Sequence, residues 1–381
     1  MMERASNPYL FPLVREPASR WERTGISPRH ERRFNLVTTL LLALFTLGWA
    51  YTIGTALAEG EPPPSVAARM TTNPLSTTAP PAAAFLTDAL VRQMVPIDEY
   101  RGASGAVNVV IQEPGGPPAV PAAELPGDAD LLYLPEGTPG VPTDTLAPTD
   151  APARPGIWNL AVRMRGAVRE VPNLHVLTLV PLSEARGGRI GRYQVGEWPR
   201  GVGGARSVAY APPKGLVEVT PENMNLQVSE HFRLRDFLTK GQENVWPKYV
   251  VISPRLLDKL ELTLQELEAM GHPVENVFVV SGFRHPHYNV HGGNPQGRGA
   301  LSRHMYGDAA DIAIDNDRNS RMDDLNGDGR VDERDARIVA EAAIRVERKH
   351  PHLIGGVGVY PPAAGHSGMV HIDTRGWQAR W

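Results

Sequence analysis

The longest apolar stretch of the chain runs from Phe34 to Ala58, a span of 25 residues without a charged side chain. Arg29, Arg32 and Arg33 come just before it. A helix needs about 20 apolar residues to cross the hydrocarbon core of a bilayer. A cleaved signal peptide is the alternative, although its apolar part usually covers only about 7–15 residues. The pattern therefore predicts a transmembrane anchor at 34–58 and a cytoplasmic tail at 1–33, because basic flanks stay in the cytoplasm.

The hydrophobic pattern changes twice after this stretch. Residues 59–156 are rich in Pro, Ala and Gly, which predicts a linker with little defined structure apart from a helix-like run at 85–95 and a strand-like run at 106–112. Short runs of apolar and alternating residues then predict a small all-β module over 157–221. Farther on, 254–271 and 334–349 carry apolar residues at helical spacing, with short strand-like runs between and after them. We therefore expect an α+β domain over 222–381, with a small antiparallel sheet and flanking helices.

The composition of the chain excludes several kinds of site chemistry. The chain has 381 residues, no Cys and a formal charge of −3. Without Cys there is no disulfide, no thiol catalysis and no thiolate metal site. The nearly balanced charge provides no global basic field, so we expect no nucleic-acid partner. Candidate chemistry must therefore come from His, Asp, Glu and Arg side chains.

Three residues of the last domain have the side chains that a metal site needs. His304 and Asp311 are seven positions apart, and His371 lies in a later strand-like run. Two imidazoles and one carboxylate suit Zn²⁺, and a fourth position left open for water is typical of a catalytic zinc site. Another divalent ion stays an alternative.

The residues around this set form extended motifs. The pattern SxHxxGxAxDI follows SGFRxPxYN and precedes VHIDTRG. Together these motifs resemble the zinc D-Ala-D-Ala carboxypeptidase group, and most of all its murein (peptidoglycan) peptidase branch. The resemblance covers about residues 225–381. The matching positions are Ser281, Gly282, Arg284, Asn289, Ser302, His304, Gly307, Ala309, Asp311, His371 and Asp373.

The resemblance implies a role for several of these residues. The zinc ligands would be His304, Asp311 and His371. Arg284 would hold the substrate or its developing oxyanion, and Asn289 and Ser302 would contact the substrate. For Arg284, a salt bridge at the end of a strand is the alternative.

One feature departs from the pattern of that group. Many of its members have an acid three residues before the last zinc ligand, or a His two residues before it. Here Gly368 and Met369 stand at those positions. The candidates for the general base are therefore Asp373, His366 and, more remotely, Asp308. Asp373 is also a candidate for orienting the last zinc-binding His.

A second metal motif lies between the two zinc segments, at 324–335. Its oxygen-bearing residues have the spacing of an EF-hand-type calcium loop, with a Gly at position 6 for the sharp turn. It resembles the dockerin type, because position 12 is Asp. An acidic, solvated turn is the alternative. The ligands expected for Ca²⁺ are Asp324, Asn326, Asp328, Arg330 through its carbonyl, Asp332 and Asp335.

These features predict a membrane-anchored, zinc-dependent peptidase that hydrolyses stem peptides or crosslinks of peptidoglycan. It would be a single-pass protein of the inner membrane, with a cytoplasmic N-terminus and a periplasmic or extracellular catalytic domain. One alternative is an inactive peptidoglycan-binding module that keeps the zinc. Another is a structural envelope protein, in which both metals stabilise the fold. The β-module would be a spacer or a packing partner for the next domain, or it would bind the cell wall or an envelope protein.

Overall fold

The computed structural model describes a large part of the chain beyond residue 107 and a short segment before it. The described residues are 36–39, 108–116, 129–135, 152–164, 167–202, 207–293, 295, 298–363 and 367–381. The chain divides into two compact units, 1–65 and 66–381, and each is taken by itself.

The predicted membrane anchor is not supported. In the first unit the structure describes only 36–39, which are helical, with Leu36 and Val37 exposed. Among the described residues, no helix is both long enough and apolar enough to span a bilayer. This finding contradicts the anchor at 34–58 and the single-pass inner-membrane localisation; the tail at 1–33 lies outside the described residues.

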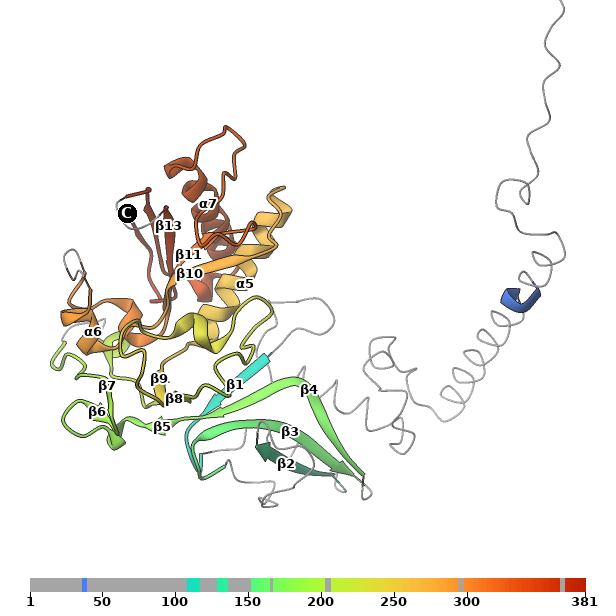
Figure 1. The fold of residues 1–381 in the computed structure, drawn as a ribbon, viewed down its shortest axis with the longest axis vertical. Helices are drawn as coiled ribbons and strands as arrows, with labels where there is room; N and C mark the ends of the chain where they lie inside the picture. The colour runs from blue at the N-terminus through green and yellow to red at the C-terminus, as the bar shows by residue number, and fades with distance from the viewer. Residues whose placement is uncertain are drawn as a thin grey trace, which may run out of the picture. The chain divides into compact units, whose positions relative to one another are not determined.

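The second unit is a mixed α+β structure with small sheets (Figure 1). Its first sheet has the strand order β1-β4-β3-β2, in which β1 and β4 are parallel and the other neighbours antiparallel. The strands of this sheet are β1 (Asn108–Gln112), β2 (Ala129–Pro135), β3 (Gly156–Met164) and β4 (Ala167–Thr178). Both β1 and β2 fall within the predicted linker, 59–156. Strand β1 coincides with the strand-like run at 106–112, whereas β2 forms where no strand was predicted. The helix-like run at 85–95 lies outside the described residues.

Two smaller sheets follow along the chain. One has the order β5-β8-β9, and the other pairs β6 with β7. Their strands are β5 (Val180–Pro181), β6 (Arg189–Ile190), β7 (Tyr193–Gln194), β8 (Gly215–Val219) and β9 (Lys248–Val250). Because β8 pairs with β9, the predicted β-module is hydrogen-bonded to the segment that follows residue 222. A single hydrophobic core includes Leu177 of β4 together with Ile312 and Ile372 of the last sheet.

The last sheet has the order β10-β11-β13-β12-β14 and is antiparallel except between β12 and β14. Its strands are β10 (Val277–Ser281), β11 (Ala309–Ile314), β12 (Gly356–Tyr360), β13 (Met369–Asp373) and β14 (Ala379–Arg380). The helices are α5 (Pro254–Ala269), α6 (Pro286–His291) and α7 (Glu333–Lys349). Single 3₁₀ turns are η2 (Leu182–Glu184), η3 (Ser207–Tyr210), η4 (Leu234–Phe237), η5 (Arg303–Tyr306) and η6 (Pro351–Leu353).

Helix α5 begins and ends where its sequence dictates. Ser253 is its N-cap, Pro254 occupies the first helical position, and Gly271 takes a left-handed φ of 91° just after the end. Its apolar residues recur every three or four positions and are buried, the pattern of a helix that packs on a core. They are Leu256, Leu257, Leu260, Leu264 and Leu267.

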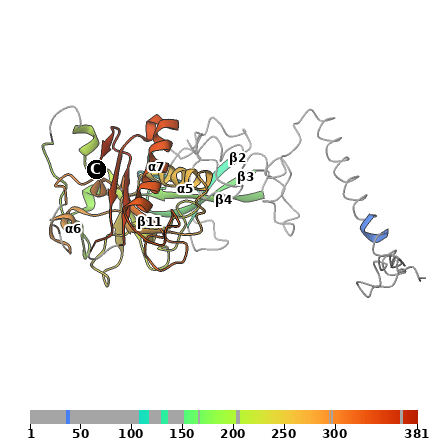
Figure 2. The ribbon, with the colours of Figure 1, turned by 90° about the horizontal axis from the view of Figure 1, so that it is seen from above.

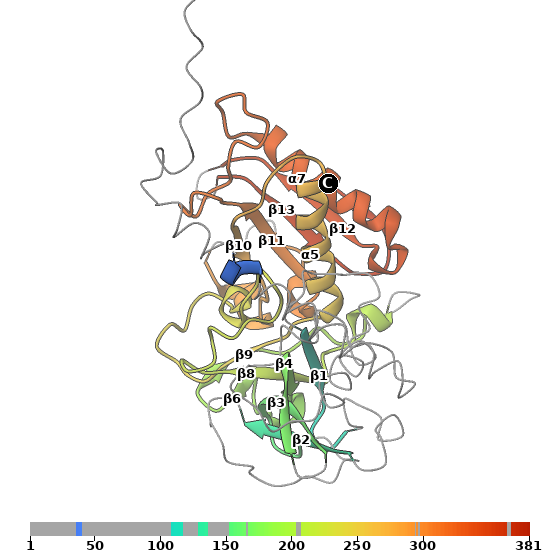
Figure 3. The same cartoon turned by 90° about the vertical axis from the view of Figure 1, so that its right-hand side faces the viewer.

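Helices α5 and α7 pack against each other, and α7 packs on β12 and β13 (Figures 1 and 3). Figure 2 shows both helices beside β11. A buried cation links these elements. Lys259 of α5 donates to Glu347 of α7 at 2.6 Å and to the carbonyl of Asp373 at 2.6 Å. Loss of one partner of such a buried pair typically costs about 3–5 kcal/mol, so this contact fixes β13 against the helices.

Candidate metal centre

Two neighbouring strands and the turn before one of them position the three predicted ligands. Asp311 of β11 and His371 of β13 are direct register partners, so their side chains lie side by side on one face of the sheet. His304 lies in η5, immediately before β11. The chain turns at Gly307, which has a φ of 70° and where a Cβ atom would lie 2.4 Å from the carbonyl oxygen of Val251. Only glycine fits this turn.

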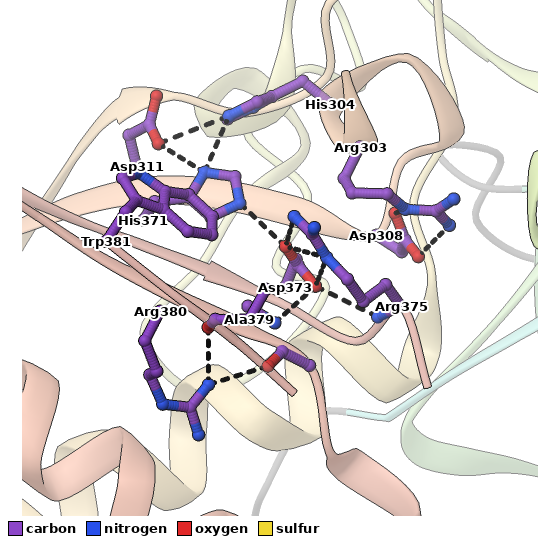
Figure 4. A network of polar contacts seen from close by, with 12 residues as sticks. Arg303, His304, Asp308, Asp311, His371, Asp373, Arg375, Ala379, Arg380 and Trp381 are labelled. Atoms are coloured by element: carbon purple, nitrogen blue, oxygen red, sulfur yellow. Dashed lines mark hydrogen bonds and ion pairs between the residues drawn. The ribbon is translucent and has the colours of Figure 1, made fainter. Parts of the chain in front are cut away.

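The donor atoms of His304, Asp311 and His371 converge (Figure 4). His304 Nε2 lies 3.2 Å from His371 Nδ1 and 3.3 Å from Asp311 Oδ1. His371 Nδ1 lies 2.9 Å from Asp311 Oδ1. Adjacent ligands of a tetrahedral zinc ion with bonds of about 2.0–2.1 Å are about 3.3 Å apart. The triangle therefore has nearly the size of one face of such a coordination sphere, and the residues present fit a zinc ion.

Hydrogen bonds at the far side of each ring turn a lone pair toward the triangle. His304 Nδ1 donates to the carbonyl of Gly282 at 2.7 Å, which leaves Nε2 as the acceptor. His371 Nε2 donates to Asp373 Oδ2 at 2.9 Å, which leaves Nδ1. All three ligand side chains are at least nine-tenths buried. Three lone pairs that face one another away from water need a cation or a proton between them.

The ionisation of the cluster agrees with this arrangement. Burial opposes the charge on Asp311, but the two imidazoles outweigh it and hold the pKa of Asp311 well below its usual range. Burial lowers the pKa of His304. Burial also opposes a charged His371, yet its hydrogen bonds to Asp311 and Asp373 raise its pKa to about 9. In the metal-free cluster His371 thus carries the proton that a metal would displace.

Asp373 lies behind the His371 ring, on the side away from His304 and Asp311 (Figure 4). It is fully buried and accepts hydrogen bonds from the Gly356 N–H at 2.7 Å and from Arg375 Nε at 2.9 Å. Together with the hydrogen bond from His371, these contacts occupy both oxygens of the Asp373 carboxylate. In this position Asp373 fixes the orientation and tautomer of His371, and the imidazole ring separates it from the donor atoms of the triangle.

Arg284 brings a cation to the edge of the triangle. Its guanidinium lies 3.7 Å from Asp311 Oδ2 and donates to Ser281 Oγ at 3.1 Å. The side chain is 13% exposed, so it is accessible from outside while mostly shielded from water. A planar guanidinium with donors left over suits a carboxylate or an oxyanion. Arg284 therefore forms a salt bridge with Asp311, the alternative that the sequence left open, and still has N–H donors for a ligand.

The other two residues predicted to contact substrate lie nearby along the chain. Asn289 is buried and donates to the carbonyl of Gly299 at 3.1 Å, while its Oδ1 is buried without a hydrogen-bond partner among the described residues. Ser302 directly precedes η5, and its side chain makes no capping hydrogen bond there. Neither forms a hydrogen bond with the ligand triangle.

The other positions considered for the general base are Gly368, Met369, Asp308 and His366. Gly368 precedes β13 with a φ of 109°, and Met369 begins the strand. Asp308 is buried and forms a two-point ion pair with Arg303. His366 lies outside the described residues. Within the described part of the chain, therefore, no predicted base stands free beside the triangle.

The predicted calcium loop folds as a turn, with Gly329 at a φ of 81°. Asp324 accepts backbone N–H groups at positions 4, 5 and 6 of the loop. Asp335 is fully buried and accepts the N–H groups of Leu325, Asn326 and Asp332. These contacts satisfy both carboxylates without a cation.

The other loop carboxylates face an arginine. Arg334 pairs with Asp328 and Asp332, each at 2.7 Å. Among the described residues, His, Asp or Glu donors come together in two groups of three. One is the His304 triangle, and the other, Asp315, Asp317 and Asp323, precedes the loop. Calcium binding by the loop, including the carbonyl of Arg330, stays a prediction.

The sequence motifs did not indicate two features of the site. The carbonyl of Gly282 orients His304, and a backbone oxygen leaves no trace in residue identity. The indole of Trp381 lies against His371, with ring centroids 5.0 Å apart. The segment that carries Trp381 directly follows VHIDTRG, and that proximity was the available signal.

Comparison with known proteins found no match. No family model, no curated protein and no solved structure was found to match the chain. Any proposal about its function therefore depends on the residues and their geometry.

Proposed function

We propose that the chain is a zinc-dependent peptidase that hydrolyses peptide bonds in the stem peptides or crosslinks of peptidoglycan. The observation that carries this proposal is the triangle of His304 Nε2, Asp311 Oδ1 and His371 Nδ1, with sides of 2.9–3.3 Å. The choice of substrate rests on the resemblance of the surrounding motifs to murein peptidases.

The triangle would hold the ion and leave a coordination position for water. A zinc ion bound there supplies a Lewis acid and lowers the pKa of its water to about 7. Arg284, at the edge of the triangle, stabilises the negative charge that develops on the carbonyl oxygen. Asp373 holds the His371 ring in the tautomer that offers Nδ1, and burial of the three ligands keeps bulk water from them.

A second candidate is a peptidoglycan-binding protein that keeps the metal and has no turnover. The absence of a free carboxylate or imidazole beside the triangle, within the described part of the chain, favours it. Gly368 and Met369 stand where many enzymes of the group that the motifs resemble place the base, and Asp373 is hydrogen-bonded to the far side of the His371 ring.

Digestion of purified crosslinked muropeptides separates the two candidates. The full chain is incubated with the muropeptides and zinc, and the products are identified by mass. The peptidase proposal predicts products with the wild type and none with His304→Ala. Asp324→Asn, in the loop, is the matched control and should cut normally. A folded, zinc-loaded wild type that binds the muropeptides without cutting them would overturn the peptidase proposal and support the binding protein.

A further inference from the structure

Trp381 is an exposed aromatic side chain placed directly at the candidate metal centre (Figure 4). Its ring centroid is 5.0 Å from that of His371, with an interplanar angle of 45°. Although it touches a buried ligand, Trp381 is 48% exposed. A large apolar side chain left half in water beside a reactive centre is available for a ligand.

Tyr360 extends this aromatic surface. Trp381 Nε1 donates to the hydroxyl oxygen of Tyr360 at 2.8 Å. Since the tyrosine hydroxyl accepts this bond, its own proton is free to donate. The Tyr360 hydroxyl has no other hydrogen bond among the described residues, and the residue is partly exposed. The Arg375 guanidinium lies over the indole ring, 5.5 Å from its centroid, so the pair offers the remaining exposed part of the indole and one hydrogen-bond donor.

The backbone of β12 and β14 fixes the position of the indole. The N–H of Val359 donates to the carbonyl of Trp381 at 2.9 Å, and β14 pairs in parallel with β12. Gly358 is the register partner of His371, and a Cβ atom there would lie 2.3 Å from Cε2 of the indole. The missing side chain of Gly358 is therefore what allows Trp381 to reach His371.

The distances place this surface within reach of a bound peptide. One extended residue spans about 3.3–3.6 Å. An indole 5.0 Å from His371 is thus one or two residues from a carbonyl held at the ligand triangle. Arg284 lies beside a different corner, Asp311. The triangle accordingly has a cationic neighbour at one ligand and an aromatic neighbour at another.

We infer that Trp381 and Tyr360 form the subsite for the stem-peptide residue that flanks the scissile bond, an inference that rests on the proposed peptidase function. The indole face packs on the apolar side or the peptide plane of that residue. The Tyr360 hydroxyl donates to a carbonyl of the same residue. The subsite sets substrate affinity and selectivity, whereas the metal triangle carries the reaction.

Four variants test the subsite on the full chain with crosslinked muropeptides and zinc. Trp381→Ala should raise KM about tenfold or more, the range for loss of a packed apolar contact, with kcat changed less than about threefold. Trp381→Phe and Tyr360→Phe each remove one polar group and should have smaller effects on KM. Gly358→Ala leaves both aromatic residues in the sequence but displaces the indole, and should reproduce the effect of Trp381→Ala. Zinc affinity should be unchanged in all four.

The outcomes separate this inference from the proposed function. If the wild type cuts muropeptides and Trp381→Ala leaves KM unchanged, or changes zinc affinity instead, the subsite is overturned while the peptidase stands. If the wild type does not cut, the peptidase fails, and the subsite is judged by the indole N–H resonance of Trp381, assigned with Trp381→Phe. A shift of that resonance on addition of the muropeptide supports a binding subsite. An unmoved resonance overturns it.

Discussion

Two segments of the same domain carry metal-binding sequence motifs, but the donor atoms of the two segments have different partners. The donors of His304, Asp311 and His371 face one another, because the far side of each imidazole is already hydrogen-bonded. The carboxylates of the loop 324–335 face backbone N–H groups and Arg334. The first set needs a cation or a proton, whereas the second is satisfied by the chain itself.

The difference shows what a ligand spacing can and cannot specify. Spacing fixes which side chains are near one another. Whether their lone pairs are free depends on the neighbours that the fold supplies, such as the Gly282 carbonyl for one histidine and Arg334 for two of the loop acids. A metal site therefore has to be judged from the partners of the ligands as well as from the ligands.

The largest effect is expected from removal of one corner of the triangle. His304→Ala should lower zinc affinity by more than about 100-fold, because even loss of an outer partner costs about 10–100-fold. Isothermal titration with zinc against a competing chelator measures this. Asp324→Asn in the loop should leave zinc affinity and stoichiometry unchanged. Equal losses in both variants would contradict the distinction between the two segments.

The next effect concerns the orientation of His371. Asp373→Asn should lower zinc affinity about 10–100-fold, because the amide no longer fixes the ring through a charged hydrogen bond. Asp308→Asn is the matched control. It changes a buried carboxylate that pairs with Arg303 and makes no hydrogen bond to the triangle, so zinc affinity should stay the same. A direct role for Asp373 in catalysis would instead lower kcat while leaving zinc affinity intact.

Substitution of Arg334 tests the prediction that the loop binds calcium. If the loop takes up Ca²⁺, the ion must replace the guanidinium between Asp328 and Asp332. Arg334→Gln removes that competitor and should tighten calcium binding by up to about fivefold, because exposed ion pairs are weak. Calorimetric titration with calcium measures the change. Absence of binding in both proteins would end the calcium interpretation of the loop.

The smallest effect is expected at His231 and Glu261, a histidine and carboxylate pair without a third donor. His231 Nδ1 lies 2.6 Å from Glu261 Oε2, and this bond, against the opposing effect of burial, raises the pKa of His231 above its ordinary 6.5. The pair therefore stabilises the fold fully below pH 6.5. That stabilisation is lost as the pH rises through the raised pKa.

Urea unfolding at pH 6 and pH 9 measures this difference. Glu261→Gln should destabilise the protein at pH 6 by about 1 kcal/mol or less more than at pH 9, since His231 is partly exposed. Glu266→Gln on the same helix is the control. Glu266 pairs with Lys349 and Arg345 and not with a histidine, so its effect should be constant. A pH-independent effect of Glu261→Gln would refute the assignment.

Local patterns in the sequence predicted much of the last domain. Apolar spacing predicted α5 and α7, and β11 and β13 form where short apolar runs carry the ligand residues. Helices are determined largely within their own length, which explains this success. The transmembrane anchor at 34–58 was the wrong prediction, since no helix among the described residues is long and apolar enough.

The features that were not predicted depend on contacts between distant residues. The parallel pairing of β1 with β4 joins segments about 60 residues apart. The approach of Trp381 to His371 requires β14 to lie beside β12 and a glycine at 358. Hydrogen bonds that side chains donate to backbone carbonyls, such as that of His304 to Gly282, also depend on the folded chain. None of these contacts produces a local sequence pattern.

X-ray absorption at the zinc edge, on the full chain loaded with one equivalent of zinc, tests the central claim most directly. The triangle predicts four light ligands at about 2.0–2.1 Å, with the outer-shell scattering of two imidazoles. His304→Ala should lose one imidazole or release the ion. A zinc environment of oxygen ligands without imidazole scattering, or one unchanged by His304→Ala, would contradict the account.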